Sequence, residues 1–324
     1  MKYKIKLLGY LKKNGANTID SLVDVLGVSR QYVHRLVNEL MDEGQVKKNG
    51  TAPHVYYSAI DTVRITEEPL SYEKERFLNE HFLIVTALGD KLNGLEGMKY
   101  WCQNQNLPLT KTIDEYIETR QKYLNFYNHE HLIDGFEKLQ NTKGIGNIGV
   151  NSLYYLDFYA IERFGKTRLG NLMHYAKQGQ NKNLMAEIVH EIKNRILFLI
   201  KKHNIEALLY VPPTISRKVQ IMGYLERNLQ IDLPKIQVKK ISNQIVIPQK
   251  ALSKLFERVA NAKSTFIVPE QAAYKKILIL DDAIGSGATI NEIALKVKEK
   301  NIAQDIVGLA ITGSYKGFEV ISEL

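Results

Sequence analysis

One segment constrains the fold of this chain more than any other. Residues 277–290 read ILILDDAIGSGATI: four apolar residues, two adjacent carboxylates, two small or apolar residues, and a Gly/Ser-rich loop that ends in Thr. Consecutive apolar residues before such a loop are typical of a buried parallel strand. The loop itself predicts a turn from this strand into a helix. The segment therefore predicts an α/β fold with a parallel sheet.

The same segment places polar groups at the carboxyl end of the expected strand, where α/β sheets bind their ligands. Gly285 and Gly287 would let backbone amides approach a phosphate. Ser286 and Thr289 add hydroxyl donors. The helix that follows would point its positive end at the same anion. We therefore expect a phosphate to bind in this loop.

Two adjacent carboxylates, Asp281 and Asp282, come directly before the loop. They would repel a phosphate, so we expect them to accept hydrogen bonds from neighbouring sugar hydroxyls or to bind Mg²⁺. The segment resembles the phosphoribosyl-diphosphate signature of type I phosphoribosyltransferases. That resemblance implies that the two acids hold the ribose hydroxyls, that Mg²⁺ accompanies the phosphoribosyl diphosphate, and that the loop holds the 5′-phosphate. The loop residues are Ala283, Ile284, Gly285, Ser286, Gly287, Ala288 and Thr289.

Three further stretches narrow the resemblance to the ComF-like branch of that family. They are HYAKQG at 174–179, LLYVPPTISRKVQIMGYL at 208–225 and QKALSKLFERVANAKSTF at 249–266. By resemblance, Arg258 joins Asp281 and Asp282 as an expected catalytic residue, and Asn261 would fix the loop that closes over the ligand. The other residues that the resemblance places at the diphosphate are Thr214, Ser216, Arg217 and Lys218. The Arg-Gly-Phe-Asn run that the family often carries near 222 is missing, which favours sensing over turnover.

The first sixty residues have apolar positions at helix spacing in three groups. Thr18 and Ser29 stand where N-caps are expected, and residues 45–60 read as two strands around turn residues. Three helices followed by a basic β-ribbon resemble a winged helix-turn-helix domain, which we expect over residues 1–62. Its Gly27 matches the tight turn before the recognition helix.

The residues left facing solvent on the expected recognition helix are rich in hydrogen-bond donors, which suits base edges and phosphates in a major groove. The predicted DNA-binding residues are Arg30, Gln31, His34, Arg35 and Asn38 on this helix, with Lys47 and Lys48 on the wing. A winged helix that makes only protein contacts is the alternative.

The region between these two domains has helical patterns but no recognisable chemistry. We predict a helical connector or dimerisation region over 63–150 and a phosphoribosyltransferase-like domain, a parallel sheet with flanking helices, over 151–324. His129 and His131 lie on different faces of a helix, so surface positions are favoured over a metal pair. The GIGNIG run at 144–149 is predicted to be a linker or tight turn.

Charge and cysteine content indicate which kinds of partner the protein binds and in which compartment it works. The chain has a net charge of +9. Residues 1–60 hold nine Lys and Arg against five acids, and residues 201–276 hold fourteen against five. Two basic regions indicate two anionic partners, namely nucleic acid and a phosphorylated ligand. The single cysteine, Cys102, cannot form an intramolecular disulfide, and no apolar stretch reaches membrane-spanning length, so we predict a cytoplasmic protein.

Three hypotheses for the function remain open. The first is a DNA-binding regulator that senses phosphoribosyl diphosphate or a related nucleotide. The second is an active transferase that the winged helix delivers to its substrate, including a nucleotide- or nucleic-acid-modifying toxin of a bacterial defence system such as a retron, with partner proteins or nucleic acid of that system. The third is a ComF-like scaffold in DNA uptake or processing. A homodimer is expected by analogy with both domain types.

Overall fold

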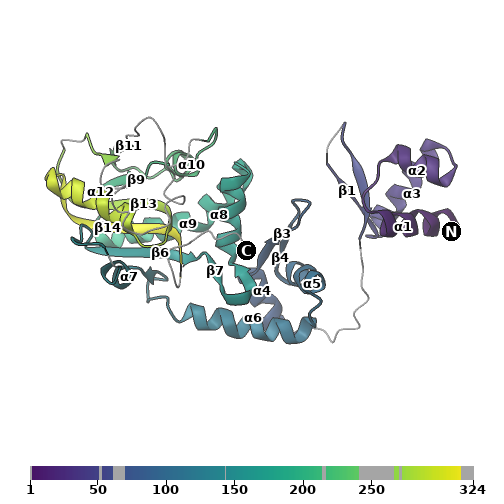
Figure 1. Cartoon of the computed structure of the whole chain (residues 1–324), viewed down its shortest axis with the longest axis horizontal. Helices are drawn as coiled ribbons and strands as arrows, with labels where there is room; N and C mark the ends of the chain where they lie inside the picture. The colour runs from purple at the N-terminus through teal and green to yellow at the C-terminus, as the bar shows by residue number, and fades with distance from the viewer. Residues whose placement is uncertain are drawn as a thin grey trace. The chain divides into compact units, whose positions relative to one another are not determined.

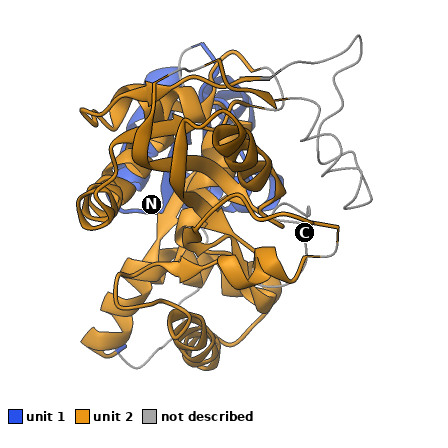
Figure 2. Cartoon of the chain, turned by 90° about the vertical axis from the view of Figure 1, so that its left-hand side faces the viewer, with its two compact units in different colours: residues 1–70, 87–89 blue, residues 71–86, 90–324 orange. Residues whose placement is uncertain are grey.

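The computed structural model describes two compact units of the chain (Figures 1 and 2). One comprises residues 1–70 with 87–89, and the other residues 71–86 with 90–324. Among the residues described, no helix combines the length and apolar character needed to cross a membrane. The described residues are 2–50, 53–60, 70–142, 144–213, 217–240, 266–269 and 272–314.

The first unit has three helices and a two-stranded antiparallel sheet. Its elements are α1 (Lys2–Asn14), α2 (Ile19–Leu26), α3 (Arg30–Asp42), β1 (Val46–Asn49) and β2 (Tyr56–Ala59). The predicted caps are present, because the Thr18 side chain accepts from Ser21 N and the Ser29 side chain accepts from Tyr32 N. Gly27 ends α2 in the left-handed conformation, with φ 67°. The core is made by fully buried Leu7, Leu22, Val33 and Val37. The predicted winged helix is confirmed.

A six-stranded sheet forms the centre of the second unit (Figure 1). The predicted strand at 277–280 is the inner part of β13, and its Ile277, Leu278 and Ile279 are fully buried. Every pairing is parallel except that of the edge strand β5 with β6. In order across the sheet, the strands are β10 (Lys235–Ile236), β9 (Ala207–Tyr210), β13 (Tyr274–Ile284), β14 (Ala303–Gly313), β6 (Ser152–Phe158) and β5 (Ile133–Asp134).

Alternate residues of a strand point to opposite faces of a sheet. Both faces of this sheet are covered by helices. Leu278 and Leu280 of β13 pack in one core with three helices: α8 (Arg168–Gln178), α9 (Lys182–His203) and α10 (Ile221–Asn228). On the other face, Gly308 of β14 approaches Ile290 of α12 (Ala288–Glu299). The short antiparallel pairs that the structure describes in the second unit outside this sheet are β3 (Leu83–Val85) with β4 (Lys91–Asn93), β7 (Ala160–Ile161) with β8 (Gly165–Lys166), and β11 (Lys239–Lys240) with β12 (Phe266–Ile267).

The segment predicted as a helical connector is built into the second unit from residue 71 onward. β5 adds an edge strand to the central sheet, and the guanidinium of Arg120 in α6 makes two hydrogen bonds of 2.9 and 3.0 Å to the carboxylate of Asp157 in β6. The helical periodicity of the segment did not predict these two contacts. A strand of two residues has no pattern of its own, and an ion pair between distant residues leaves none. The elements are α4 (Tyr72–His81), β3 (Leu83–Val85), β4 (Lys91–Asn93), α5 (Gly94–Gln105), α6 (Leu109–Leu124), β5 and α7 (Phe136–Gln140).

The GIGNIG run, predicted as a linker or tight turn, packs directly against α12. The buried side-chain amide of Asn291 accepts from Gly149 N at 2.8 Å and donates to Asn147 O at 2.9 Å. A Cβ on Gly149 would lie 2.6 Å from Leu295 N, so only glycine fits at this position. The run therefore ties the preceding segment to the helix that follows the predicted phosphate loop.

Candidate functional site

The two carboxylates lie at the carboxyl end of β13, where the sequence analysis placed them. Asp282 N donates to Asp281 Oδ1 at 2.7 Å. Burial, followed by the negative charge of Asp282, raises the pKa of Asp281 to about 7. Near neutral pH this carboxyl group is therefore divided between its neutral and charged forms. It can donate or accept a hydrogen bond, which suits a sugar hydroxyl.

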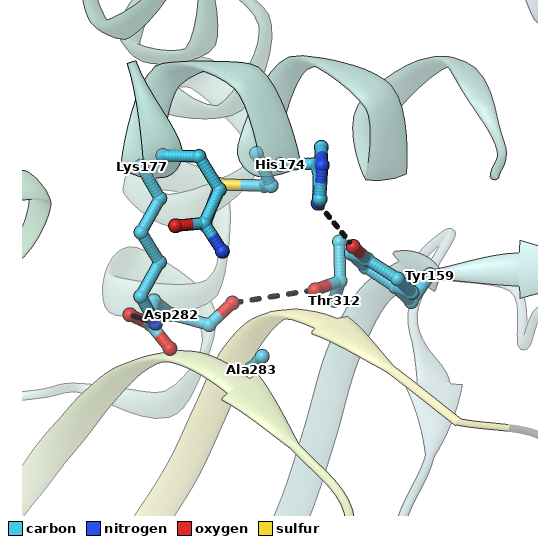
Figure 3. A pocket seen from close by; sticks show the side chains of 8 residues that line it. Tyr159, His174, Lys177, Asp282, Ala283 and Thr312 are labelled. Carbon is cyan, nitrogen blue, oxygen red and sulfur yellow. Dashed lines mark hydrogen bonds and ion pairs between the residues drawn. The ribbon is translucent and has the colours of Figure 1, made fainter. Parts of the chain in front are cut away.

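A lysine that the sequence analysis did not select lies against this carboxylate pair. Lys177, in the last turn of α8, donates to Asp282 Oδ2 (Figure 3). Arg217 holds the same end of α8, since it donates to Lys177 O at 2.7 Å and to the side-chain oxygen of Gln178 at 3.0 Å. Two cationic side chains are thus brought from separate segments to the side of the carboxylates that α8 covers.

A pocket opens between the end of α8 and the carboxyl ends of the strands (Figure 3). Its polar wall contains a hydrogen bond of 2.9 Å between Tyr159 Oη and His174 Nδ1. Burial raises the pKa of the Tyr159 hydroxyl, so it stays protonated. The pocket is small and combines apolar surface with several hydrogen-bonding groups beside Asp282. Its lining residues are Tyr159, Met173, His174, Lys177, Gln178, Asp282, Ala283 and Thr312.

The loop after β13 leads into the N-terminus of α12. Gly287 precedes this helix in the left-handed conformation with φ 79°, and a Cβ there would lie 2.9 Å from Leu153 Cδ2. Ser286 Oγ accepts from Ala288 N at 3.3 Å. The N-cap residue makes no side-chain hydrogen bond, and the first turn of α12 has no acidic residue. Amides at a helix start can bind an anion, although Ser286 Oγ already accepts from the first of them here.

The structure describes only part of the predicted diphosphate-binding set. Arg217 is described and contacts the end of α8, whereas its neighbour Lys218 is exposed to solvent. The remaining four predicted residues lie outside the described part of the chain; they are Thr214, Ser216, Arg258 and Asn261.

Sequence reasoning missed several residues of the site. Lys177 lies in HYAKQG, a stretch that the resemblance singled out without a role for its lysine. Tyr159 and Thr312 follow or end buried strands, and nothing in their sequence neighbourhood distinguishes them from core residues. They join the site because β14 lies between β6 and β13, which the sequence does not reveal.

Within the described residues, no three His, Cys, Asp or Glu side chains gather as a metal site. The carboxylates of Asp281 and Asp282 are the kind of oxygen ligand that Mg²⁺ accepts, but Asp282 already pairs with Lys177. They therefore suit a Mg²⁺ ion held mainly by ligand oxygens and water. His129 and His131 are exposed, as predicted, but they lie in a turn after α6 and not on a helix. The Nε2 atom of His129 is 3.2 Å from Lys202 Nζ.

In the first unit, the predicted base-reading side chains form one exposed face of α3, because they are spaced three to four residues apart. Arg30 donates to Asp20 at 2.7 Å, and the Arg35 guanidinium lies 4.7 Å from the centre of the Tyr32 ring. On the wing, Lys48 is exposed and Lys47 is half-buried. The exposed face of α3 is formed by Arg30, Gln31, His34, Arg35 and Asn38.

Comparison with known proteins identifies the first unit. Residues 2–47 match a protein family described as winged helix-turn-helix DNA-binding. No curated protein matches the chain. The N-terminal unit is a winged helix-turn-helix DNA-binding domain, and the predicted donors of α3 are exposed to solvent.

Proposed function

We propose that this DNA-binding protein uses its second unit to bind phosphoribosyl diphosphate together with Mg²⁺. One observation carries the proposal. Asp281 and Asp282 lie near the carboxyl end of a buried parallel strand, and the loop that follows leads into a helix whose N-cap residue is a glycine. Hydroxyl-accepting carboxylates beside an anion-binding helix start match a phosphorylated sugar.

The cationic side chains around the carboxylates support a ligand with more than one phosphate group. Lys177 and Arg217 lie on the α8 side of the strand end, whereas the loop lies at the start of α12. A 5′-phosphate on the loop would leave the diphosphate at C1′ of the ribose for the cationic side. Mg²⁺ would neutralise that diphosphate, with Asp281 and Asp282 as its candidate protein ligands, directly or through water.

Transfer is a second candidate function, and the polar groups around the small pocket beside Asp282 are the observation that favours it. Tyr159, His174 and Thr312 line a space next to the site proposed for the ribose. A nitrogen nucleophile held there could attack C1′, with cleavage of the bond from C1′ to the diphosphate oxygen. A regulator that only senses the ligand needs no such acceptor space. Release of pyrophosphate therefore separates the two functions.

The binding test is calorimetric titration of the full chain with phosphoribosyl diphosphate and Mg²⁺. We expect saturable binding that is lost when Asp281→Asn and Asp282→Asn are combined. Asp305→Asn is the matched control, because Asp305 pairs with Lys276 near the opposite end of the paired strands. A folded protein that gives no binding heat would overturn the proposal.

The second test measures both consequences of binding. Pyrophosphate release in the presence of free nucleobases would identify a transferase. A ligand-dependent change in DNA affinity without pyrophosphate release would identify a regulator, since an effector must bind two states with different affinities. The Asp281/Asp282 double variant should lose either response while keeping its basal DNA affinity.

A further inference from the structure

We propose that Tyr32 is a positioning residue for base recognition, which together with Glu39 holds the guanidinium of Arg35 on the exposed face of α3 so that it reads a guanine. The three residues belong to the DNA-binding unit, so their role is independent of the ligand proposed for the second unit. An arginine pairs with guanine through two parallel hydrogen bonds to O6 and N7 in the major groove, which require one orientation of the planar guanidinium. The contacts of Arg35 restrict that orientation before DNA is bound.

The ring of Tyr32 is held by two helices. Its backbone N–H donates to the N-cap side chain of Ser29 at 3.3 Å, in the first turn of α3. The half-buried ring packs against the core of the first unit. Tyr3 of α1 meets it edge to face, with 5.9 Å between the ring centres and an angle of 87° between the planes. Tyr32 therefore offers a fixed aromatic surface at the border of the exposed face of α3.

Arg35 lies on this aromatic surface. It follows Tyr32 by three residues, so the two side chains lie on the same side of the helix. The central carbon of the guanidinium is 4.7 Å from the centre of the Tyr32 ring, which is within the range of a cation–π contact. The Arg35 side chain is nevertheless 65% exposed. Tyr32 thus limits the directions that Arg35 can take and leaves it accessible to DNA.

The carboxylate of Glu39 favours a base edge over a phosphate as the partner of Arg35. Glu39 Oε1 lies 3.7 Å from Arg35 Nε, and Glu39 Oε2 lies 2.9 Å from Lys4 Nζ of α1. A negative charge at this place repels the DNA backbone, whereas a guanine edge is neutral and presents two acceptors. Because Glu39 faces the Nε side of the guanidinium, the two Nη groups can donate to O6 and N7.

The test starts from the preferred sequence that the full chain selects from random DNA. Fluorescence anisotropy then measures binding of that sequence and of its single-base variants. Arg35→Ala should lower the preference for guanine at one position roughly tenfold. Tyr32→Leu should lower the same preference about two- to fivefold, and Tyr32→Phe should keep most of it, because the ring face remains. Tyr10→Leu is the matched control, since Tyr10 packs against the same core from α1.

A double-mutant cycle distinguishes positioning from a general loss of structure. In the Arg35→Ala background, Tyr32→Leu should have no further effect on discrimination at that base position. Tyr32→Leu alone should leave the slope of log affinity against log salt unchanged, since no phosphate contact is lost. A loss of affinity in Tyr32→Leu that is equal for every base at that position would overturn the proposal. A selected sequence in which no guanine depends on Arg35 would overturn it as well.

Glu39→Gln keeps the proposal testable if Tyr32→Leu does not fold. This variant removes the negative charge beside Arg35 and keeps the shape of the side chain, while Lys4 retains Glu43 as a partner. We expect a weaker preference for guanine, tighter binding to unrelated sequences and a steeper dependence on salt, because Arg35 can then reach a phosphate. An unchanged guanine preference together with an unchanged salt dependence would contradict the proposal.

Discussion

Lys177 and Asp282 form an ion pair between the last turn of α8 and the carboxyl end of β13, although 105 residues separate them in the chain. The positive charge of Lys177 also lowers the pKa of Asp281, against the larger effects of burial and of Asp282. One lysine therefore holds together two negative charges that would otherwise repel each other. Any ligand that uses Asp282 must compete with this contact.

Replacing Lys177 should change the titration of the neighbouring carboxyl group. In Lys177→Met the positive charge is lost, so we expect Asp281 to titrate at a higher pH than in the unchanged protein. Carbon-13 NMR of the Asp side-chain carboxyls, with Asp281→Asn for assignment, measures the midpoint. Lys276→Met should leave it unchanged. An unchanged or lower midpoint in Lys177→Met would contradict the electrostatic role of this lysine.

Asp281 should make stability depend on pH. Its folded pKa of about 7 lies above the ordinary value of 3.8 for an Asp carboxyl group, so the native state binds this proton more tightly than the unfolded chain does. The contribution of Asp281 to the free energy of unfolding is complete below about pH 4 and is lost as the pH rises through about 7. The loss amounts to at most about 4 kcal/mol. Asp281→Asn should therefore raise the free energy of unfolding at pH 8 and have little effect at pH 4. Urea denaturation at both pH values checks this, and equal effects at both would refute it.

The buried pair of Arg120 and Asp157 should be important for stability. Their side chains are 4% and 8% exposed, and Tyr127 Oη adds a hydrogen bond of 2.6 Å to Asp157. Arg120→Met should cost about 3–5 kcal/mol, because it leaves Asp157 buried without its cation. In the same denaturation assay, Arg76→Met should cost less than about 1 kcal/mol, since its ion pair with Glu80 is exposed. Similar costs for the two variants would show that the buried pair is dispensable.

Gly287 should tolerate no side chain. Gly287→Ala would have an unfavourable φ of 79° and a Cβ 2.9 Å from Leu153 Cδ2. We expect a loss of about 1–3 kcal/mol in thermal or urea unfolding and weaker ligand binding, because the loop must shift. The control is Gly146→Ala, where a Cβ meets nothing within 4 Å. Unchanged stability and binding in Gly287→Ala would mean that the loop adapts freely.

The exposed face of α3 and the wing should contribute differently to DNA binding. After a preferred sequence has been selected from random DNA, Asn38→Ala should relax specificity at individual base positions by about 1–3 kcal/mol. Lys48→Ala should weaken binding to all sequences and lower the slope of log affinity against log salt by about one. Fluorescence anisotropy at several salt concentrations distinguishes the two effects. Arg76→Ala, in the other unit, should change neither.

Sequence alone was sufficient for features that depend on neighbouring residues. The caps at Thr18 and Ser29 and the turn at Gly27 mark the first unit, because capping uses side chains within three residues of the helix start. Likewise, four apolar residues before Asp281 identify the central strand of the second unit, and the Gly-rich stretch identifies the loop after it.

Only the tertiary structure decided which distant residues meet that loop. Lys177 is one of 44 basic residues, and the resemblance that singled out its stretch gave this lysine no role. β5 has two residues, too few for a periodic signal, yet it pairs with β6, and residues 71–86 and 90–150 belong to the same unit as the sheet. Periodicity reports which face of an element is apolar, but not which element will cover it. Strand order and helix packing settle that choice, and they place a cation from α8 beside the carboxylates.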